Sequence, residues 1–237
     1  MDEQTRVDIF HAQCENVRAL NMVWKQINSN INRHYTKDQV VQAERETRLL
    51  AIVYCALAES IFSKLIHTPY GLSLAQIAQV KSIQSDRGVK AGWLKCVDFA
   101  LDRVDAARSN HVPNARQRLE RIVTSYIFDP SIIRNRLAHG QWSIALNGDS
   151  SAINSELTAE IQSLDIVELY RRRTALDALS AILEDVIESP NSAHMRDYWI
   201  RLTTFEEQAR LQNAWTLRGK LEALKIKASR MTNTRGG

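Results

Sequence analysis

The sequence is poor in the residues that tight turns require, with 8 Gly and 4 Pro in 237 residues. An all-β chain of this length would need many more of them, so the composition favours long helices. Cysteine is also scarce: Cys14, Cys55 and Cys96 lie about forty residues apart, without a CxxC pair. We expect all three to be small buried hydrophobic residues in a reducing compartment, rather than zinc ligands or disulfide partners.

Long apolar stretches are missing as well. No run approaches the roughly 18 residues that a membrane span needs, and the first ten residues, MDEQTRVDIF, are too polar for a secretory signal. We therefore expect a cytoplasmic protein with no membrane association. The chain also lacks a glycine-rich phosphate loop, an HExxH motif and a supported Ser-His-Asp set. On this basis we expect no cofactor and no metal.

Apolar residues recur at steps of three and four along most of the chain, which predicts an all-α protein. Thr36 and Ser73 are expected to begin the second and third helices as N-caps, and a loop is expected at 111–114. Asp129 and Pro130 have the residue types of an N-cap and a first helical position, so they should begin a short helix that stops at Gly140. The expected helices are approximately 3–32, 37–67, 73–83, 89–107, 115–127, 130–139, 165–188, 193–211 and 213–230.

Two regions depart from this pattern. Residues 141–163 contain WSIAL, an Asn147-Gly148 pair and a second partly alternating stretch, which predicts a small β-hairpin. Residues 191–237 hold nine Lys and Arg against four Asp and Glu, a net charge of +5, whereas residues 1–190 carry −1. The charge favours an anionic partner, although solubility alone explains it equally well. We predict a helical domain over 1–190 and a basic helical extension over 191–237.

The candidate functional centre is the segment from Arg134 to Gly140, RNRLAHG. Arg-x4-His alone carries no information, because 22 Arg and six His produce roughly 1.7 matches by chance when three spacings are allowed. A second match does occur, from Arg6 to His11. Only the later one has a polar residue after the Arg, a His at a helix end and a Gly directly after that His.

Helical geometry places the polar groups of this segment. Asn135 and His139 are four residues apart and share a face, and Arg136 is three residues before His139. Arg134 lies about 140° round the helix from His139, so only its long side chain would reach the imidazole. A titrating His beside a fixed cation suits RNA strand cleavage, in which His moves a proton and Arg holds the phosphate. The alternative is an ordinary helix end with solvated Arg side chains.

The segment IRNRLAHGQW resembles the signature of the HEPN superfamily, in which an Arg, a polar residue and a His form the site. The upstream stretch YCALAESIFSKLIHTPYGLS is similar to the core helix and turn of HEPN proteins from prokaryotic defence and toxin–antitoxin systems. The resemblance covers about residues 40–190. It implies an antiparallel helical bundle and a homodimer in which two motif helices face each other. Arg134, Asn135 and His139 carry over as the catalytic set.

This resemblance leads to two functional hypotheses. The first is a metal-independent endoribonuclease, a toxin or abortive-infection effector of antiviral defence, with a composite site at the dimer seam. The alternative is a non-catalytic HEPN-like binding or scaffolding subunit, which pairs with an antitoxin or a defence complex. The first hypothesis makes RNA the substrate, and the second makes a protein or RNA the bound partner.

Other polar residues are candidates for supporting roles. Glu59 is a lone carboxylate in the most apolar helix, so it should pair with a cation, either Arg134 or His139 at the site or Lys64 as a structural partner. Arg136 is expected to support the site. The run Arg171–Arg173 is expected to be a solvated face, with RNA-backbone contact as the less favoured alternative. Trp199 and Trp215 are expected to be core or partner contacts, with stacking on RNA bases as the less favoured alternative. Candidate RNA-backbone contacts in the C-terminal region are Arg196, Arg201, Arg210, Arg218, Lys220 and Lys225.

Overall fold

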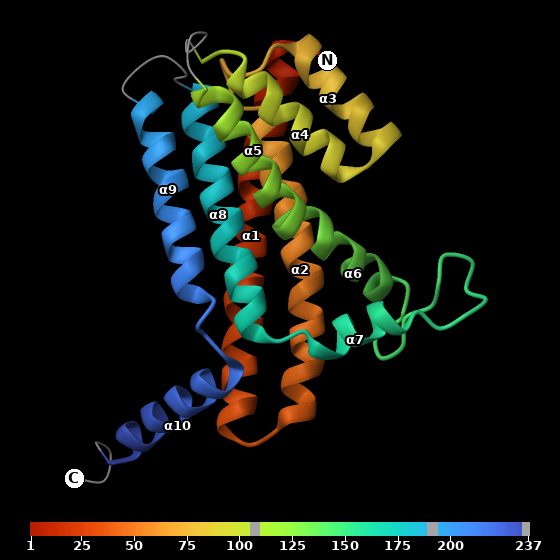
Figure 1. Cartoon of the computed structure of the whole chain (residues 1–237), viewed down its shortest axis with the longest axis vertical. Coiled ribbons are helices and arrows are strands. Elements are labelled where there is room, and N and C mark those ends of the chain that lie inside the picture. The colour runs from red at the N-terminus through yellow and green to blue at the C-terminus, as the bar shows by residue number, and fades with distance from the viewer. Residues whose placement is uncertain (105–109, 189–193, 234–237) are drawn as a thin grey trace.

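The computed structural model describes residues 1–104, 110–188 and 194–233, except for the side chains at 194–196 and 231–233, and these residues form helices without a strand (Figure 1). The all-α prediction is therefore confirmed for the described part of the chain. The elements are α1 Glu3–Thr36, α2 Val40–Ile66, α3 Leu74–Arg87, α4 Val89–Leu101, α5 His111–Val123, η1 Thr124–Phe128, α6 Asp129–Ala138, α7 Ser155–Ser163, α8 Ile166–Glu188, α9 His194–Gln212 and α10 Leu217–Asn233.

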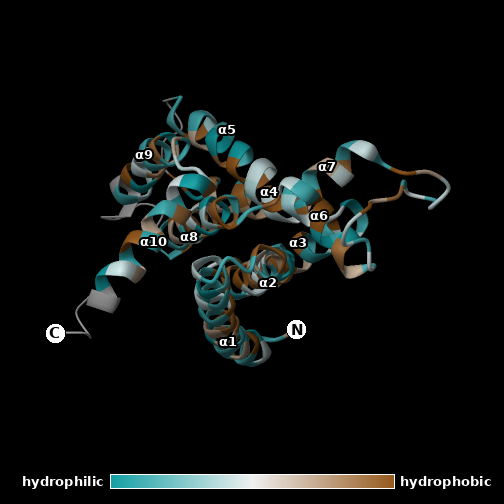
Figure 2. Ribbon diagram, turned by 90° about the horizontal axis from the view of Figure 1, so that it is seen from below, coloured by the Kyte–Doolittle hydropathy of each residue, from teal (hydrophilic) through white to brown (hydrophobic). Residues whose placement is uncertain are grey.

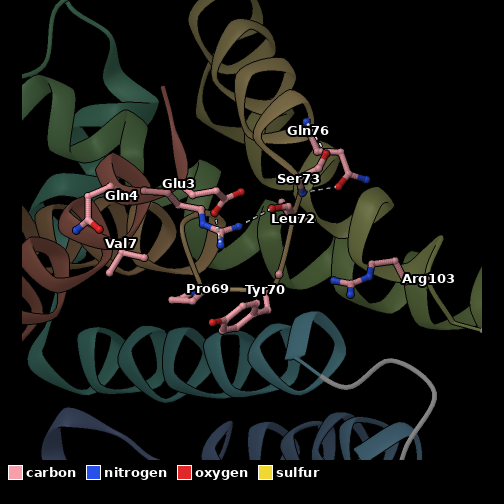
Figure 3. A pocket seen from close by; sticks show the side chains of 11 residues that line it. Glu3, Gln4, Val7, Pro69, Tyr70, Leu72, Ser73, Gln76 and Arg103 are labelled. Atoms are coloured by element: carbon pink, nitrogen blue, oxygen red, sulfur yellow. Dashed lines mark hydrogen bonds and ion pairs between the residues drawn. The ribbon is translucent and has the colours of Figure 1, made fainter.

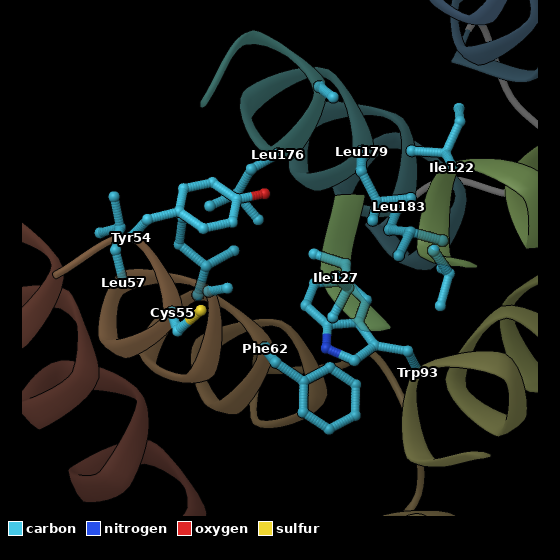
Figure 4. Close-up of a cluster of buried hydrophobic side chains, with 14 of the residues drawn as sticks. Tyr54, Cys55, Leu57, Phe62, Trp93, Ile122, Ile127, Leu176, Leu179 and Leu183 are labelled. Carbon is cyan, nitrogen blue, oxygen red and sulfur yellow. The ribbon is translucent and has the colours of Figure 1, made fainter. Parts of the chain in front are cut away.

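The centre of the bundle is α2, which packs between α1 and α8 and also contacts α6. Its buried residues, from Ala43 to Ile66, lie on more than one face of the helix, so it can contact neighbours on several sides. Figure 2 shows many hydrophobic positions along the α2 ribbon. Figure 4 shows Tyr54, Leu57 and Phe62 of α2 facing Leu176 of α8 and Trp93 of α4. Among the described helices only α2 is long and apolar enough to cross a membrane, and 56% of its most apolar window is buried inside the protein. A core helix has this property too.

The first two turns between helices differ in how well the sequence predicted them. Ser73 caps α3 as expected, and its hydroxyl and the Gln76 side chain form a complete capping box. That helix runs on to Arg87 and ends where Gly88 adopts a φ of 85°. The prediction for Thr36 was wrong, because its hydroxyl donates to the Arg33 carbonyl and it is the last residue of α1.

The chain is helical without a break from His111 to Ala138, through α5, the π-helical turn η1 and α6. The expected loop at 111–114 is therefore wrong. The helix α6 does begin at Asp129, with Pro130 in its first turn. The expected N-cap role of Asp129 is wrong, because Phe128 and Asp129 already have helical dihedral angles and α6 continues directly from η1. A π-helical turn inserts one extra residue, and this insertion is a common cause of a local change in helix direction.

Pro130 sits inside this long run and lacks the N–H that a regular α-helix would direct at the Tyr126 carbonyl. The hydroxyl of Tyr54 on α2 takes its place and donates to that carbonyl at 2.5 Å. The same hydroxyl lies 3.1 Å from the Arg172 carbonyl of α8. Burial raises the pKa of Tyr54 well above its ordinary value, so the phenol remains a proton donor. One side chain therefore ties three elements together.

The predicted β-hairpin over 141–163 is wrong. Only an isolated bridge joins Leu146 and Ile153. The Asn147 side chain accepts hydrogen bonds from the backbone N–H groups of Ser151 and Ala152, which closes a wider loop than a two-residue turn. Asn154 then caps α7 by accepting from the Leu157 N–H, so the expected second strand begins a helix instead.

The C-terminal helices differ from each other in their packing. From α9, which lies along α8, Tyr198, Leu202 and Phe205 enter the same core as the rest of the bundle. By contrast, α10 extends away from the end of α9 and contacts mainly α1 (Figure 1). Residues 191–237 thus include one helix that shares the main core and one at its edge.

The hydrogen bond of Tyr54 should be important for stability. Tyr54→Phe removes the only described donor that replaces the Pro130 N–H, so we expect a loss of about 1–3 kcal/mol in the free energy of unfolding. Urea denaturation measures this loss. Tyr70→Phe is the matched control, because the Tyr70 side chain is 92% exposed. Equal stability of the two variants would contradict the role given to Tyr54.

Candidate functional site

The end of α6 has a complete Schellman motif. The Gly140 N–H donates to the Leu137 carbonyl at 3.1 Å, and the Gln141 N–H donates to the Arg136 carbonyl at 3.0 Å. Gly140 makes this possible with a φ of 81°. The motif fixes the backbone of His139, which is the capping residue of the helix. The predicted stop at Gly140 is confirmed.

The loop beyond Gly140 folds back and reinforces this helix end. The indole N–H of Trp142 donates to the Leu137 carbonyl at 2.9 Å. The Gln141 side chain accepts from the Leu146 N–H, also at 2.9 Å. The first bond holds the loop against α6 and the second closes the loop on itself, so His139 sits on a stable turn and not on a fraying end.

Arg134 reaches across to α2 and forms an ion pair with Glu59. Of the three partners offered for Glu59, which were Arg134, His139 and Lys64, the structure selects Arg134, and Lys64 pairs with Glu184 of α8 at 2.7 Å. Although Glu59 lies in the most apolar helix, its side chain is 52% exposed, against 34% for Arg134. The pair therefore lies at the surface, where solvent and ligands reach it.

The Cys55 thiol near this pair is buried, unlike the pair itself. Cys55 is buried on α2 and its Sγ lies 3.7 Å from the Pro130 carbonyl. Burial raises its pKa to about 12, against a smaller opposing effect of Arg134. At neutral pH the group stays a neutral thiol, so it packs and does not act as a nucleophile. Cys96 is buried with a pKa of about 12 for the same reason, and Cys14 is partly buried.

Asn135 and His139 are exposed on the outer face of α6. Ile132 shares this face, since it lies about 20° from His139 at 100° per residue, and its side chain is 39% exposed. Arg136 is partly buried. In the described part of the chain, Asn135, Arg136 and His139 form no side-chain hydrogen bond or ion pair. Their polar groups are available to a ligand.

The two Arg-x4-His matches have different surroundings in the structure. Arg6 is buried to 6% exposure, pairs with Glu3 at 2.5 Å and donates to the Leu72 carbonyl at 3.4 Å. His11 lies on the exposed side of the same long helix. Arg6 lines a pocket of about 530 Å³ where the start of α1 meets the α2–α3 turn (Figure 3). In the earlier match, therefore, Arg6 has a structural role, and His11 does not form a site with it.

The predicted solvated face at Arg171–Arg173 was wrong. Arg171 and Arg172 both pair with Glu168, and Arg173 pairs with Asp177. The three side chains are only 11–23% exposed. They are structural cations whose stems are covered by neighbouring helices.

The predicted RNA contacts of the C-terminal region are scattered and mostly paired with carboxylates. Arg201 pairs with Asp185 at 2.6 Å, Arg218 with Glu222 at 3.0 Å and Lys225 with Asp38 at 3.4 Å. Arg210 is exposed and Lys220 is partly buried. The Arg196 side chain lies outside the described part. These residues do not gather beside Arg134.

The two tryptophans singled out in this region have different surroundings. Trp199 is partly buried on α9, with its ring 4.5 Å from that of His111 and under the Arg118 guanidinium at 4.4 Å. It is a packing residue, as expected. Trp215 is 48% exposed and borders a pocket together with Asn28, Asn32 and Tyr170. That pocket was not predicted from the sequence, although the four-residue spacing of the two Asn was a signal for a shared helix face.

Comparison with protein-family models, characterised proteins and solved structures gives no match for this chain. Within the described residues, no three His, Cys, Asp or Glu side chains lie close enough to hold a metal ion. The site is therefore characterised by its own geometry: a surface ion pair across two helices, and an exposed Asn and His at a fixed helix end.

The helix end makes a direct prediction. Gly140→Ala places a side chain at positive φ, which costs about 1–2 kcal/mol, and its Cβ meets no atom within 4 Å. The expected result is a loss of that size in unfolding free energy, measured by thermal and urea denaturation. Gly148→Ala is the control, because that site is equally open and lacks the positive φ. If both substitutions cost the same, the strain assigned to Gly140 is wrong.

Proposed function

We propose that the protein is a metal-independent endoribonuclease of the HEPN type whose site consists of Arg134, Asn135 and His139. The observation that carries the proposal is the surface ion pair of Arg134 with Glu59, in which Arg134 lies on the same short helix, α6, that ends at the fixed and exposed His139. The carboxylate orients the guanidinium, which suits an Arg that must hold a phosphate and stabilise its developing charge. The resemblance of IRNRLAHGQW to the HEPN signature supports the same conclusion.

The reaction would be an internal transesterification of RNA. The 2′-oxygen bonds to the adjacent phosphorus as its proton passes to an imidazole, and the bond from phosphorus to the 5′-oxygen breaks. A second imidazole, protonated, gives its proton to the leaving 5′-oxygen. Arg134 stabilises the charge on the non-bridging oxygens, and Asn135 donates a hydrogen bond to the same phosphate. The products are a 2′,3′-cyclic phosphate and a 5′-hydroxyl.

Two imidazoles are needed for this proton transfer, and each chain places one at the site. A homodimer in which the outer faces of two α6 helices meet supplies both. The exposed Ile132 lies on the same face as Asn135 and His139, so this seam would bury it. The proposed biological setting is a toxin or abortive-infection effector whose activity an antitoxin or a defence complex controls.

The most direct genetic test concerns His139. His139→Ala should reduce cleavage of single-stranded RNA in EDTA by at least about 100-fold, because it removes the proton-transfer group, and should leave folding and oligomeric state unchanged. A denaturing gel measures cleavage, and sedimentation measures the oligomer. His11→Ala is the matched control, since His11 belongs to the other Arg-x4-His match. Undiminished cleavage by His139→Ala, or cleavage only with divalent metal, would defeat the proposal.

The same experiment distinguishes catalysis from the alternative function, non-catalytic binding. RNA binding by the wild type, seen as a mobility shift without any cleavage in any buffer, would favour the non-catalytic binding module. The intact Arg, Asn and His set is the reason to place catalysis first.

The ion pair gives a second test. Glu59→Gln keeps the shape of the side chain and removes its charge, so we expect at least a tenfold loss of kcat with a stability change of about 0–1 kcal/mol, as for surface pairs. Glu184→Gln is the control, because Glu184 pairs with Lys64 away from the site. A loss of stability without loss of activity for Glu59→Gln would show that the pair is only structural.

A further inference from the structure

A pocket of about 660 Å³ lies between α1, the start of α8 and the start of α10. Its volume is in the range of small-molecule sites. Three segments of the chain, α1, α8 and residues 214–223, form its walls, and every lining residue belongs to the described part. The lining residues are Asn28, Asn32, Val167, Tyr170, Ala214, Trp215, Thr216, Gly219, Lys220 and Ala223.

Two aromatic rings form one side of this pocket. Tyr170 and Trp215 have ring centroids 6.4 Å apart and an interplanar angle of 50°. Their side chains are 44% and 48% exposed, so ring surface remains uncovered. The backbone that presents Trp215 is fixed, because the Arg171 guanidinium donates to the carbonyls of Gln212 at 3.0 Å and Trp215 at 2.5 Å. Exposed but anchored aromatic rings provide a stacking surface.

A cation lies beside the rings. The Nζ of Lys220 is 6.0 Å from the centroid of Tyr170. Its neighbours on α10, Arg218 and Lys225, both pair with carboxylates, whereas Lys220 has no acidic partner among the described residues. Burial lowers its pKa. A bound anion would compensate for the desolvation of this ammonium group.

Two amides face the same space from α1. Asn28 and Asn32 are one helical turn apart, and both line the pocket. The side-chain oxygen of each is buried and has no hydrogen-bond partner in the described part of the protein. Buried polar atoms normally have partners, so two unpartnered amides at one pocket point to a ligand that supplies donors.

We propose that this pocket binds a nucleotide, with its base stacked on Tyr170 and Trp215 and its phosphate beside Lys220. Donor groups on the base or sugar then pair with Asn28 and Asn32. A nucleotide is the ligand class that uses all three features, since inorganic phosphate would engage only the lysine and a free base only the rings. The pocket contains none of the proposed catalytic residues, so this inference does not depend on the ribonuclease proposal.

The test titrates purified full-length protein with AMP, UMP, adenosine and inorganic phosphate in EDTA, followed by calorimetry and by tryptophan fluorescence. A free nucleotide and the end of an RNA strand share this chemistry, so a 5′-phosphorylated RNA hexamer forms a separate arm, with its 2′-hydroxyls methylated so that the proposed cleavage cannot occur. We expect AMP or UMP to bind at least about tenfold more tightly than adenosine or phosphate, because base stacking and the phosphate contact both contribute. Binding of the hexamer without binding of the mononucleotides would identify a strand end as the ligand.

Point substitutions locate the binding. Trp215→Ala and Lys220→Ala should each raise the Kd at least about tenfold, and Ala223→Phe should block the pocket in a chain that keeps both groups. Lys227→Ala, an exposed lysine further along α10, should leave the Kd unchanged. Circular dichroism confirms that each variant is folded. Absence of binding in every arm, phosphate binding as tight as nucleotide binding, or equal affinity in all folded variants would overturn the proposal.

Discussion

The helical run that carries the motif is held on α2 at three successive turns, and the site depends on this attachment. The Tyr54 hydroxyl donates to the Tyr126 carbonyl, Cys55 contacts the Pro130 carbonyl, and Glu59 pairs with Arg134. Tyr126, Pro130 and Arg134 are spaced four residues apart, so they present two carbonyl acceptors and one cation to side chains of a single buried helix. The attachment begins where Pro130 leaves a carbonyl without its helical donor, and it ends at the proposed catalytic Arg.

The sequence predicted those parts of the fold that local patterns determine. The Ser73 capping box and the Gly140 stop are set by residues within a few positions of each other, and both are present. Asp129 with Pro130 has the residue types of a helix start, but tertiary contacts from Tyr54 allow the proline inside a continuous helix. At 141–163 the side chains of Asn147 and Asn154 compete for backbone groups and replace the expected strands.

The candidate site was found from the sequence only in part. The spacing of Asn135 and His139 on one face follows from helix geometry alone. The partner of Glu59 could not be predicted in this way, because the choice between Arg134 and Lys64 depends on how α2 faces α6 and α8. Arg201, Arg218 and Lys225, three of the candidate RNA contacts, lie beside carboxylates. Only the pair of Arg218 with Glu222, four residues apart, could have been expected from helical spacing.

The chemical identity of the cleavage products tests the central claim most directly. Single-stranded RNA of defined sequence, incubated with the protein in EDTA, is separated into its fragments, and mass spectrometry identifies both new ends. Proton transfer by His139 with charge stabilisation by Arg134 requires a 2′,3′-cyclic phosphate on one fragment and a 5′-hydroxyl on the other. Fragments with a 3′-hydroxyl and a 5′-phosphate would contradict the account.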